Sequence, residues 1–100
     1  MSHDDTTKAL ADLMGVLADP TRLRIMFHLA ASPMIVGQLA SSMDLQQPAV
    51  SHHLMLLRVR GVVQHQRKGK AVIYNLAPRV RVRARSIVFV IGKQTLSIGY

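Results

Sequence analysis

A polar stretch in the middle of the chain has residue types that can hydrogen-bond to DNA bases. A brief turn over residues 45–47 leads to Pro48, which suits the first position of a helix that ends before Gly61. Polar side chains at the exposed start of such a helix can contact base edges, and glutamine can pair with adenine through two hydrogen bonds. The alternative is that these residues only cap and solvate the helix. The candidates are Gln46, Gln47, Ser51 and His52.

A group of positively charged residues follows this helix a few positions after Gly61 and could make a second contact with DNA. The flanking segments Val62–Gln66 and Ala71–Leu76 have strand-forming composition, which predicts a hairpin with a cationic tip. Such a tip could reach phosphates or a minor groove beside the helix. The alternative is that its charges are simply solvated. The tip residues are Arg67, Lys68 and Lys70.

The histidines do not form an evident metal site. His52 and His53 are adjacent, so on a helix they point about 100° apart and cannot hold one metal from the same surface. We expect His52 to face outward and His53 to be structural or to face phosphate. His28 and His65 stand singly in apolar stretches and are expected to be ordinary core or surface histidines.

The chain also lacks the residues that several kinds of chemistry need. It has no cysteine, which excludes disulfides, thiolate metal sites and thiol redox switches. It has no phosphate-binding glycine loop and no close acid pair with a base, so we expect neither an enzyme nor a cofactor.

Charge is distributed unevenly along the 100 residues. Residues 1–44 carry three lysine or arginine residues against five aspartates, whereas residues 45–100 carry ten basic residues and no acidic one. Such a basic half is expected to attract a polyanion such as a nucleic acid, and a membrane surface could exploit the same charge. No apolar run approaches the roughly 18 residues of a membrane span, and no leader segment opens the chain, so we expect a cytoplasmic protein with no membrane partner.

The chain is expected to form one compact domain, residues 1–100. Helical periodicity and helix-breaking residues divide it into predicted helices. Residues 1–4 form a polar tail, and apolar spacing then predicts a helix over Asp5–Leu17. Asp19 and Pro20 begin a second helix that ends near Ala31, and a third runs from about Ile35 to Asp44. The third and fourth helices, joined by a tight turn, suit a helix-turn-helix.

The end of the chain is ambiguous. Arginine alternates with apolar residues over 79–85, and residues 87–91 are mostly β-branched, so local propensity favours strands.

The chain resembles the ArsR/SmtB family of winged-helix repressors over about residues 8–78. Asp-Pro-Thr-Arg at a helix start, Ser-His-His-Leu and a Lys-Gly-Lys wing occur here in the family's order and spacing. The matching segments are Leu17-Ala-Asp-Pro-Thr-Arg-Leu-Arg-Ile25, Gln38-Leu-Ala40, Val50-Ser-His-His-Leu54, Leu57-Arg58 and Gly61-Val-Val63.

The resemblance implies a mainly α fold with a small β-hairpin, a winged helix-turn-helix of four helices, two strands and a last helix. It implies a homodimer in which the first helix packs with a C-terminal helix, so residues 79–100 are expected to form a dimerisation helix in spite of their strand propensity. It also implies a partly palindromic double-stranded DNA operator and repression by blocking polymerase. With Arg58 and His53 from the matching motifs, the expected DNA-binding set is Gln46, Gln47, Ser51, His52, His53, Arg58, Arg67, Lys68 and Lys70.

The sensing residues of the family are missing. Many members bind metals through cysteines in the third helix, where this chain has Ile35 and Gly37, and others use C-terminal His and acidic residues, none of which follows His65. A different effector, a protein partner or no effector remains. The main hypothesis is therefore a dimeric DNA-binding repressor without metal sensing, and the alternative is a dimeric module that binds a protein or an acidic surface, with DNA binding secondary.

Overall fold

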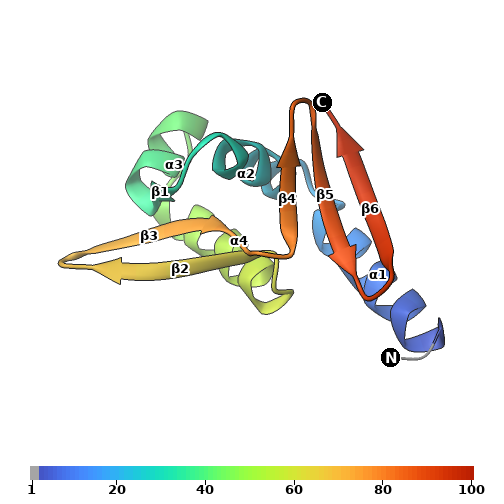
Figure 1. Ribbon diagram of the computed structural model, residues 1–100. Coiled ribbons are helices and arrows are strands. Elements are labelled where there is room, and N and C mark those ends of the chain that lie inside the picture. Colours follow the sequence, from blue (N-terminus) through green and yellow to red (C-terminus); the bar gives the residue numbers. More distant parts are fainter. Residues whose placement is uncertain (1–2) are drawn as a thin grey trace.

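The computed structural model describes residues 3–100, and four helices make up their first part (Figure 1). The helices are α1 (His3–Leu17), α2 (Pro20–Ala31), α3 (Val36–Met43) and α4 (Gln47–Val59). All four predicted helices are confirmed. Helix α1 begins at His3, so the predicted tail of residues 1–4 is too long by two residues, and its first two residues lie outside the described part.

Short polar contacts set the ends of the central helices. The Asp19 carboxylate accepts a hydrogen bond from the Arg22 backbone N–H at 3.0 Å, and Pro20 follows as the first helical residue, so α2 begins where the sequence predicts. At the start of α3 the Gln38 side-chain oxygen accepts from the Ile35 N–H at 3.0 Å. Helix α3 ends at Met43, and Asp44 directly after it has a φ of 54°, a left-handed conformation that aspartate tolerates.

The core lies between the four helices and the inward-facing residues of the strands that pack on them. Val50, Leu54 and Leu57 of α4 are all fully buried, as their helical spacing predicts. They pack in one cluster with apolar residues of every helix. The other buried helical members are Leu13, Leu17, Ile25, Met26, Leu29, Leu39, Ala40 and Met43.

The predicted hairpin is present and forms a wing that projects from the helices (Figure 1). Strand β2 (Val63–Lys68) pairs antiparallel with β3 (Ala71–Leu76), and β1 (Met34–Ile35), which was not predicted, pairs with the other side of β3. The strands continue further toward the tip than expected, so Arg67 and Lys68 belong to β2. Only the Gly69–Lys70 turn connects the strands, and Gly69 takes a φ of 62° that glycine adopts without strain.

The expected C-terminal helix is wrong. Residues 80–99 form a second antiparallel sheet of β4 (Val80–Arg83), β5 (Ser86–Ile91) and β6 (Gln94–Gly99), in the order β4-β5-β6. The physical reason is the one that local propensity indicated, because buried and half-buried residues alternate along β5 with period two, which a helix could not place on one face. The predicted order of four helices and two wing strands is therefore matched up to β3, apart from the additional strand β1, and fails after it.

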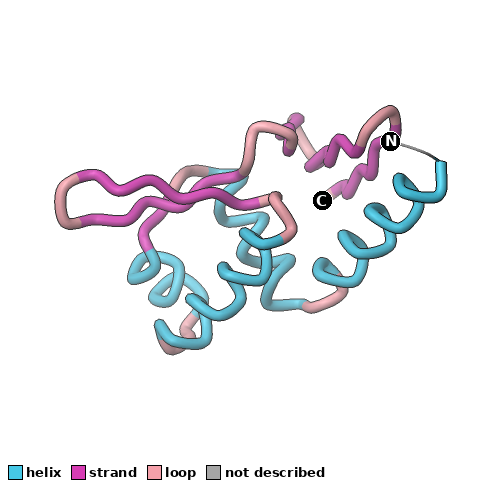
Figure 2. The backbone as a smooth tube through the Cα atoms, turned by 90° about the horizontal axis from the view of Figure 1, so that it is seen from below, coloured by secondary structure: helices cyan, strands magenta, loops and turns pink. Residues whose placement is uncertain are grey.

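The second sheet joins the same core. Ile87, Phe89 and Ile91 of β5 are buried together with Val80, and Figure 2 shows the strands on one side of the molecule and the helices on the other. Arg79, just before β4, donates from its guanidinium to the Arg60 carbonyl at the end of α4. A cation there is favourable because the last carbonyls of a helix lack partners.

Candidate nucleic-acid interface

Helices α3 and α4 form the helix-turn-helix that the sequence predicts. Three residues, Asp44 to Gln46, connect them, and the Leu45 N–H donates back to the Ala40 carbonyl at 2.9 Å. This bond turns the chain sharply, while the buried side of α4 fixes its position on the core. The opposite side of α4 is therefore held in place by the fold and remains accessible.

The four residues predicted to contact bases are all exposed at the start of α4. Gln46 occupies the N-cap position without a capping hydrogen bond from its side chain, and Gln47 and Ser51 are one turn apart on the same face. His52 is exposed next to them, as expected. The Gln47 amide nitrogen leans toward α3, since a Cβ atom on Gly37 would lie 3.5 Å from it.

His53 differs from its neighbours because it is half-buried and contacts another helix. Its Nδ1 lies 3.3 Å from the Arg22 Nη1. A guanidinium can only donate, so Nδ1 accepts and the ring proton of neutral His53 lies on Nε2. Of the two expectations for His53, the structural role is the one for which the geometry provides a partner.

Arg22 was not predicted as part of the site, yet it connects the segments that hold α4. Besides contacting His53, its Nε–H donates to the Val16 carbonyl near the end of α1. Its backbone N–H, followed by its charge, keeps the pKa of Asp19 below the usual value. The sequence placed Arg22 in a family motif but gave no signal of this contact across 31 positions.

The wing cations are exposed, but they do not form one cluster. Arg67 and Lys68 are successive strand residues and therefore point to opposite faces of the hairpin, whereas Lys70 lies in the turn. The stacked rings of His65 and Tyr74, a directly opposed pair with centroids 5.3 Å apart, stiffen the middle of the wing. His65 is thus a surface residue, one of the two options expected for it.

Arg58 does not lie with the base-contacting candidates. It is exposed in the last turn of α4, 11 positions after Gln47 and so about 16 Å along the helix axis. The structure brings Gln46, Gln47, Ser51 and His52 together at one end of α4 and leaves Arg58 at the other.

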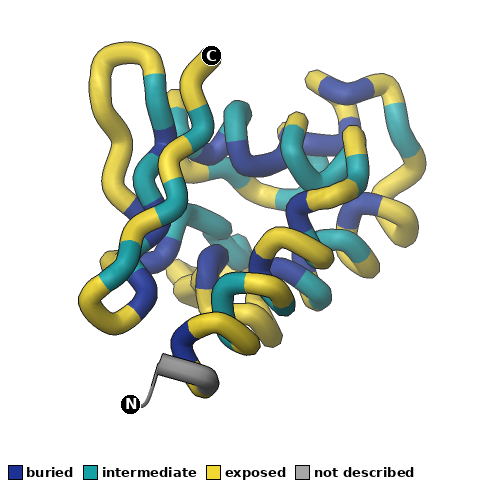
Figure 3. The backbone as a smooth tube through the Cα atoms, turned by 90° about the vertical axis from the view of Figure 1, so that its right-hand side faces the viewer, coloured by how far each residue is buried: buried dark blue, intermediate teal, exposed yellow. Residues whose placement is uncertain are grey.

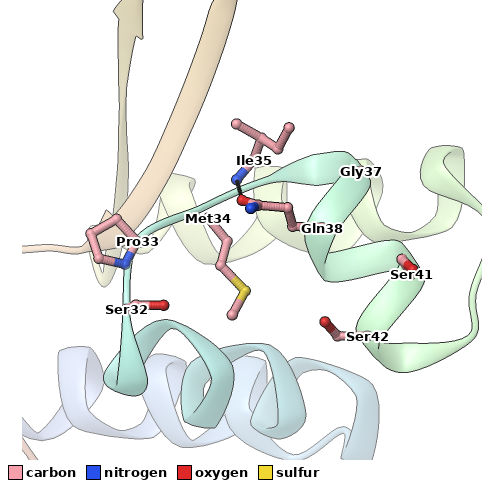
Figure 4. A pocket seen from close by; sticks show the side chains of 8 residues that line it. All are labelled: Ser32, Pro33, Met34, Ile35, Gly37, Gln38, Ser41 and Ser42. Atoms are coloured by element: carbon pink, nitrogen blue, oxygen red, sulfur yellow. Dashed lines mark hydrogen bonds between the residues drawn. The ribbon is translucent and has the colours of Figure 1, made fainter.

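A groove of about 470 Å³ lies beside the start of α3 (Figure 4). It includes the two positions at which many members of the family that the sequence resembles have metal-binding cysteines. Ile35 and Gly37 line it, and Figure 4 shows the Met34 thioether between α2 and the two serines of α3. Its side chains are hydroxyls, an amide, a thioether and apolar groups, without thiolate, imidazole or carboxylate. Metal binding by thiolates does not fit this donor set. The lining residues are Ser32, Pro33, Met34, Ile35, Gly37, Gln38, Ser41 and Ser42.

The described residues hold neither a cluster of metal ligands nor a membrane-spanning helix. No group of three His, Asp or Glu residues there could hold a metal ion. No described helix is long and apolar enough to cross a membrane.

The helix-turn-helix followed by a wing defines a winged-helix protein, and comparisons identify its family. The model of the bacterial regulatory proteins of the arsR family matches residues 19–65. The transcriptional repressor SmtB homolog of Synechocystis is 41% identical over 73 residues, which are 73% of this chain and 55% of that protein. Reduced HlyU from Vibrio cholerae superimposes with a TM-score of 0.70 at 31% identity, over 74% of this chain and 78% of that one. The chain belongs to the arsR family.

A further solved structure adds an assembly. The DNA-binding domain of Mb0332 from Mycobacterium bovis, a possible ArsR-family regulator described as a homodimeric winged helix-turn-helix, has a TM-score of 0.69 at 25% identity, over 77% of this chain and 73% of that one. The relatives are transcriptional regulators rather than enzymes, which agrees with the sequence prediction. The chain spans about half the length of the SmtB-type repressors that it matches, 55% and 51%.

Proposed function

We propose that the protein is a sequence-specific, DNA-binding transcriptional repressor that acts as a homodimer in the cytoplasm. Its family and the repressor names of its relatives support this function over a module that binds mainly protein or acidic surfaces. The uneven charge supports it as well, because ten basic residues and no acidic residue follow Asp44 in the sequence. A basic region of this kind attracts the phosphates of DNA.

One observation carries the proposal: polar side chains are exposed at the start of a helix whose other side is fully buried. Val50 and Leu54 fix the helix, and the exposed residues between and before them are free to enter a major groove. Gln46, Gln47, Ser51 and His52 then contact base edges, while Arg67, Lys68 and Lys70 bind phosphate. Arg58 contacts backbone from the far end of α4, and His53 positions the helix through Arg22.

A homodimer presents two copies of α4 to one DNA duplex. Two-fold symmetry in the protein requires two half-sites related by the same symmetry, spaced about 34–36 Å or a multiple of it. The operator is therefore partly palindromic. Bound there, the dimer prevents polymerase from occupying the same DNA.

Selection of bound duplexes from a random pool tests this function directly. Purified protein is mixed with the pool at about 0.15 M salt, bound duplexes are recovered over several rounds, and their sequences are compared. Two inverted half-sites at one fixed spacing are expected. Recovery of unrelated sequences with equal affinity would overturn sequence-specific repression and leave only general DNA binding.

A further inference from the structure

The second sheet has two edges, and they differ in how many backbone groups they leave free. In an antiparallel pair, successive residues alternately bond to the neighbouring strand and point away from it. The Tyr100 N–H donates to the Arg85 carbonyl at 2.8 Å, which fixes the alternation for β6. Thr95, Ser97 and Gly99 therefore direct their N–H and C=O groups away from β5.

Strand β4, at the other edge, offers less. The Val90 N–H donates to the Arg79 carbonyl, so by the same alternation only Val80 and Val82 direct backbone groups outward. The Val80 N–H is already bonded to the Ala77 carbonyl at 2.9 Å. The β4 edge is thus shorter than the β6 edge, and one of its outward groups is already bonded within the protomer.

Charge separates the two edges further. Strand β4 and its turn carry Arg81, Arg83 and Arg85, all exposed, and charged residues on an edge strand oppose pairing with another chain. Strand β6 has no charged residue over its six positions. In a chain with a formal charge of +8, this is a strand along which two copies can approach without direct repulsion.

The side chains of β6 also favour a copy of the same strand. Thr95, Ser97 and Gly99 are small and exposed, so none blocks the edge. Leu96 and Ile98 lie on the inner face and are only half-buried, although they pack on the core cluster. In Figure 3 the strand that ends at the C-terminus lies at the front of the sheet with no other segment over it.

We propose that β6 is the dimer interface and that two copies pair antiparallel through it into one continuous six-stranded sheet. The symmetric register places Ser97 opposite Ser97 of the second copy and Thr95 opposite Gly99, so that the outward N–H and C=O groups bond in pairs. The same register sets Leu96 beside Ile98 of the second copy and buries both. This surface rests on the homodimer of the proposed function and takes the place of the C-terminal helix expected from the family.

Two substitutions at Ser97 test the interface without removing a bond inside the protomer. Ser97→Pro removes an N–H that points away from β5, a position at which an edge strand accepts proline. Ser97→Lys places two like charges directly opposite each other in the dimer. Ser32→Lys adds the same charge at an exposed serine outside both sheets and serves as the control.

Sedimentation equilibrium of the full chain measures the monomer–dimer dissociation constant, and circular dichroism confirms that each variant is folded. We expect the wild type and Ser32→Lys to dimerise equally, and both Ser97 variants to dimerise at least about tenfold more weakly. Folded Ser97 variants that dimerise like the wild type would overturn β6 as the interface. Loss of dimer in Met14→Lys alone would assign it instead to α1, where Met14 is 52% exposed.

The result remains distinct from that for DNA binding. A Ser97→Lys monomer is expected to keep its half-site preference in the random-pool selection and to lose affinity for the paired half-sites. A Ser97→Lys variant that still dimerises and selects an operator would contradict the β6 interface alone. A wild-type dimer that selects no sequence would contradict the repressor function alone.

Discussion

Individual residues at the start of α4 divide into those that face outward and those that hold the helix. Gln47 and Ser51 are exposed on one face, whereas His53, one position from an exposed histidine, contacts Arg22. Neighbours in sequence therefore have different roles because a helix turns each side chain by about 100° from the last. The division leads to separate expectations for base contacts, phosphate contacts and support.

Replacing Gln47 by Ala and Lys68 by Ala should have different effects on DNA binding. A lost base contact relaxes the preference at one position in each half-site, by about 1–3 kcal/mol of discrimination, while other positions keep theirs. A lost phosphate contact weakens binding to all sequences equally and lowers the slope of log K against log salt by about 1. Titration of the selected duplex and its single-base variants at several salt concentrations measures both. Equal loss on all duplexes for both variants would contradict the assignment of Gln47.

Replacing Arg22 by Ala should destabilise the protein although Arg22 is not proposed to touch DNA. The Val16 carbonyl and the His53 ring both lose a charged donor, which is expected to lower the free energy of unfolding by about 1–3 kcal/mol. Urea unfolding measures the loss. Arg24→Ala, an exposed arginine of the same helix, is the control, and equal stability of the two variants would show that the Arg22 contacts contribute nothing.

At the scale of elements, the helices could be predicted from the sequence. For the C-terminal sheet, local propensity favoured strands, but the resemblance to the family favoured a helix. The Asp19-Pro20 start and the spacing of Val50, Leu54 and Leu57 are local signals, and local physics decides helix caps and buried faces. The strand pattern around Phe89 was also present in the sequence, but the resemblance to the family led to the wrong prediction of a helix there. The contact of Arg22 with His53 was not predictable because it depends on how two helices pack, which no local pattern specifies.

Phe89 tests whether the second sheet belongs to the fold. It is 1% exposed in the common core, so Phe89→Ala is expected to cost about 3–5 kcal/mol of unfolding free energy. Val82→Ala, where the valine is 46% exposed, should cost far less. Chemical denaturation followed by circular dichroism compares the two. A loss for Phe89→Ala no larger than for Val82→Ala would mean that the sheet does not pack on the helices.

The start of α2 should depend on pH through Asp19. Its pKa is lowered below 3.8 by the Arg22 N–H and charge, so ionised Asp19 stabilises the folded state at neutral pH. That contribution is lost as the pH falls from 3.8 through the lower pKa of the folded state. Asp19→Asn keeps a good cap but not the charge. Urea unfolding should therefore find the variant less stable at pH 7 and the difference shrinking in acid, and a difference that stays constant down to about pH 2 would contradict the cause given for the lowered pKa.

For the whole molecule, the arrangement separates the part proposed to contact DNA from the strand proposed to form the dimer. Figure 1 shows the wing projecting on one side and β6 at the other, along a molecule whose longest dimension is 41 Å. Basic residues are concentrated from α4 onward, but β6 carries none. One chain can therefore bind a polyanion and still pair with a copy of itself.

The affinity ratio between the selected duplex and a scrambled duplex of the same length and composition tests the central claim most directly. Both dissociation constants are measured at about 0.15 M salt, where nonspecific phosphate contacts are screened. A sequence-specific repressor that uses the start of α4 should bind the selected duplex at least about 10³-fold more tightly. A ratio near one would contradict the account, because it would leave the basic half of the chain as a general attraction for nucleic acid.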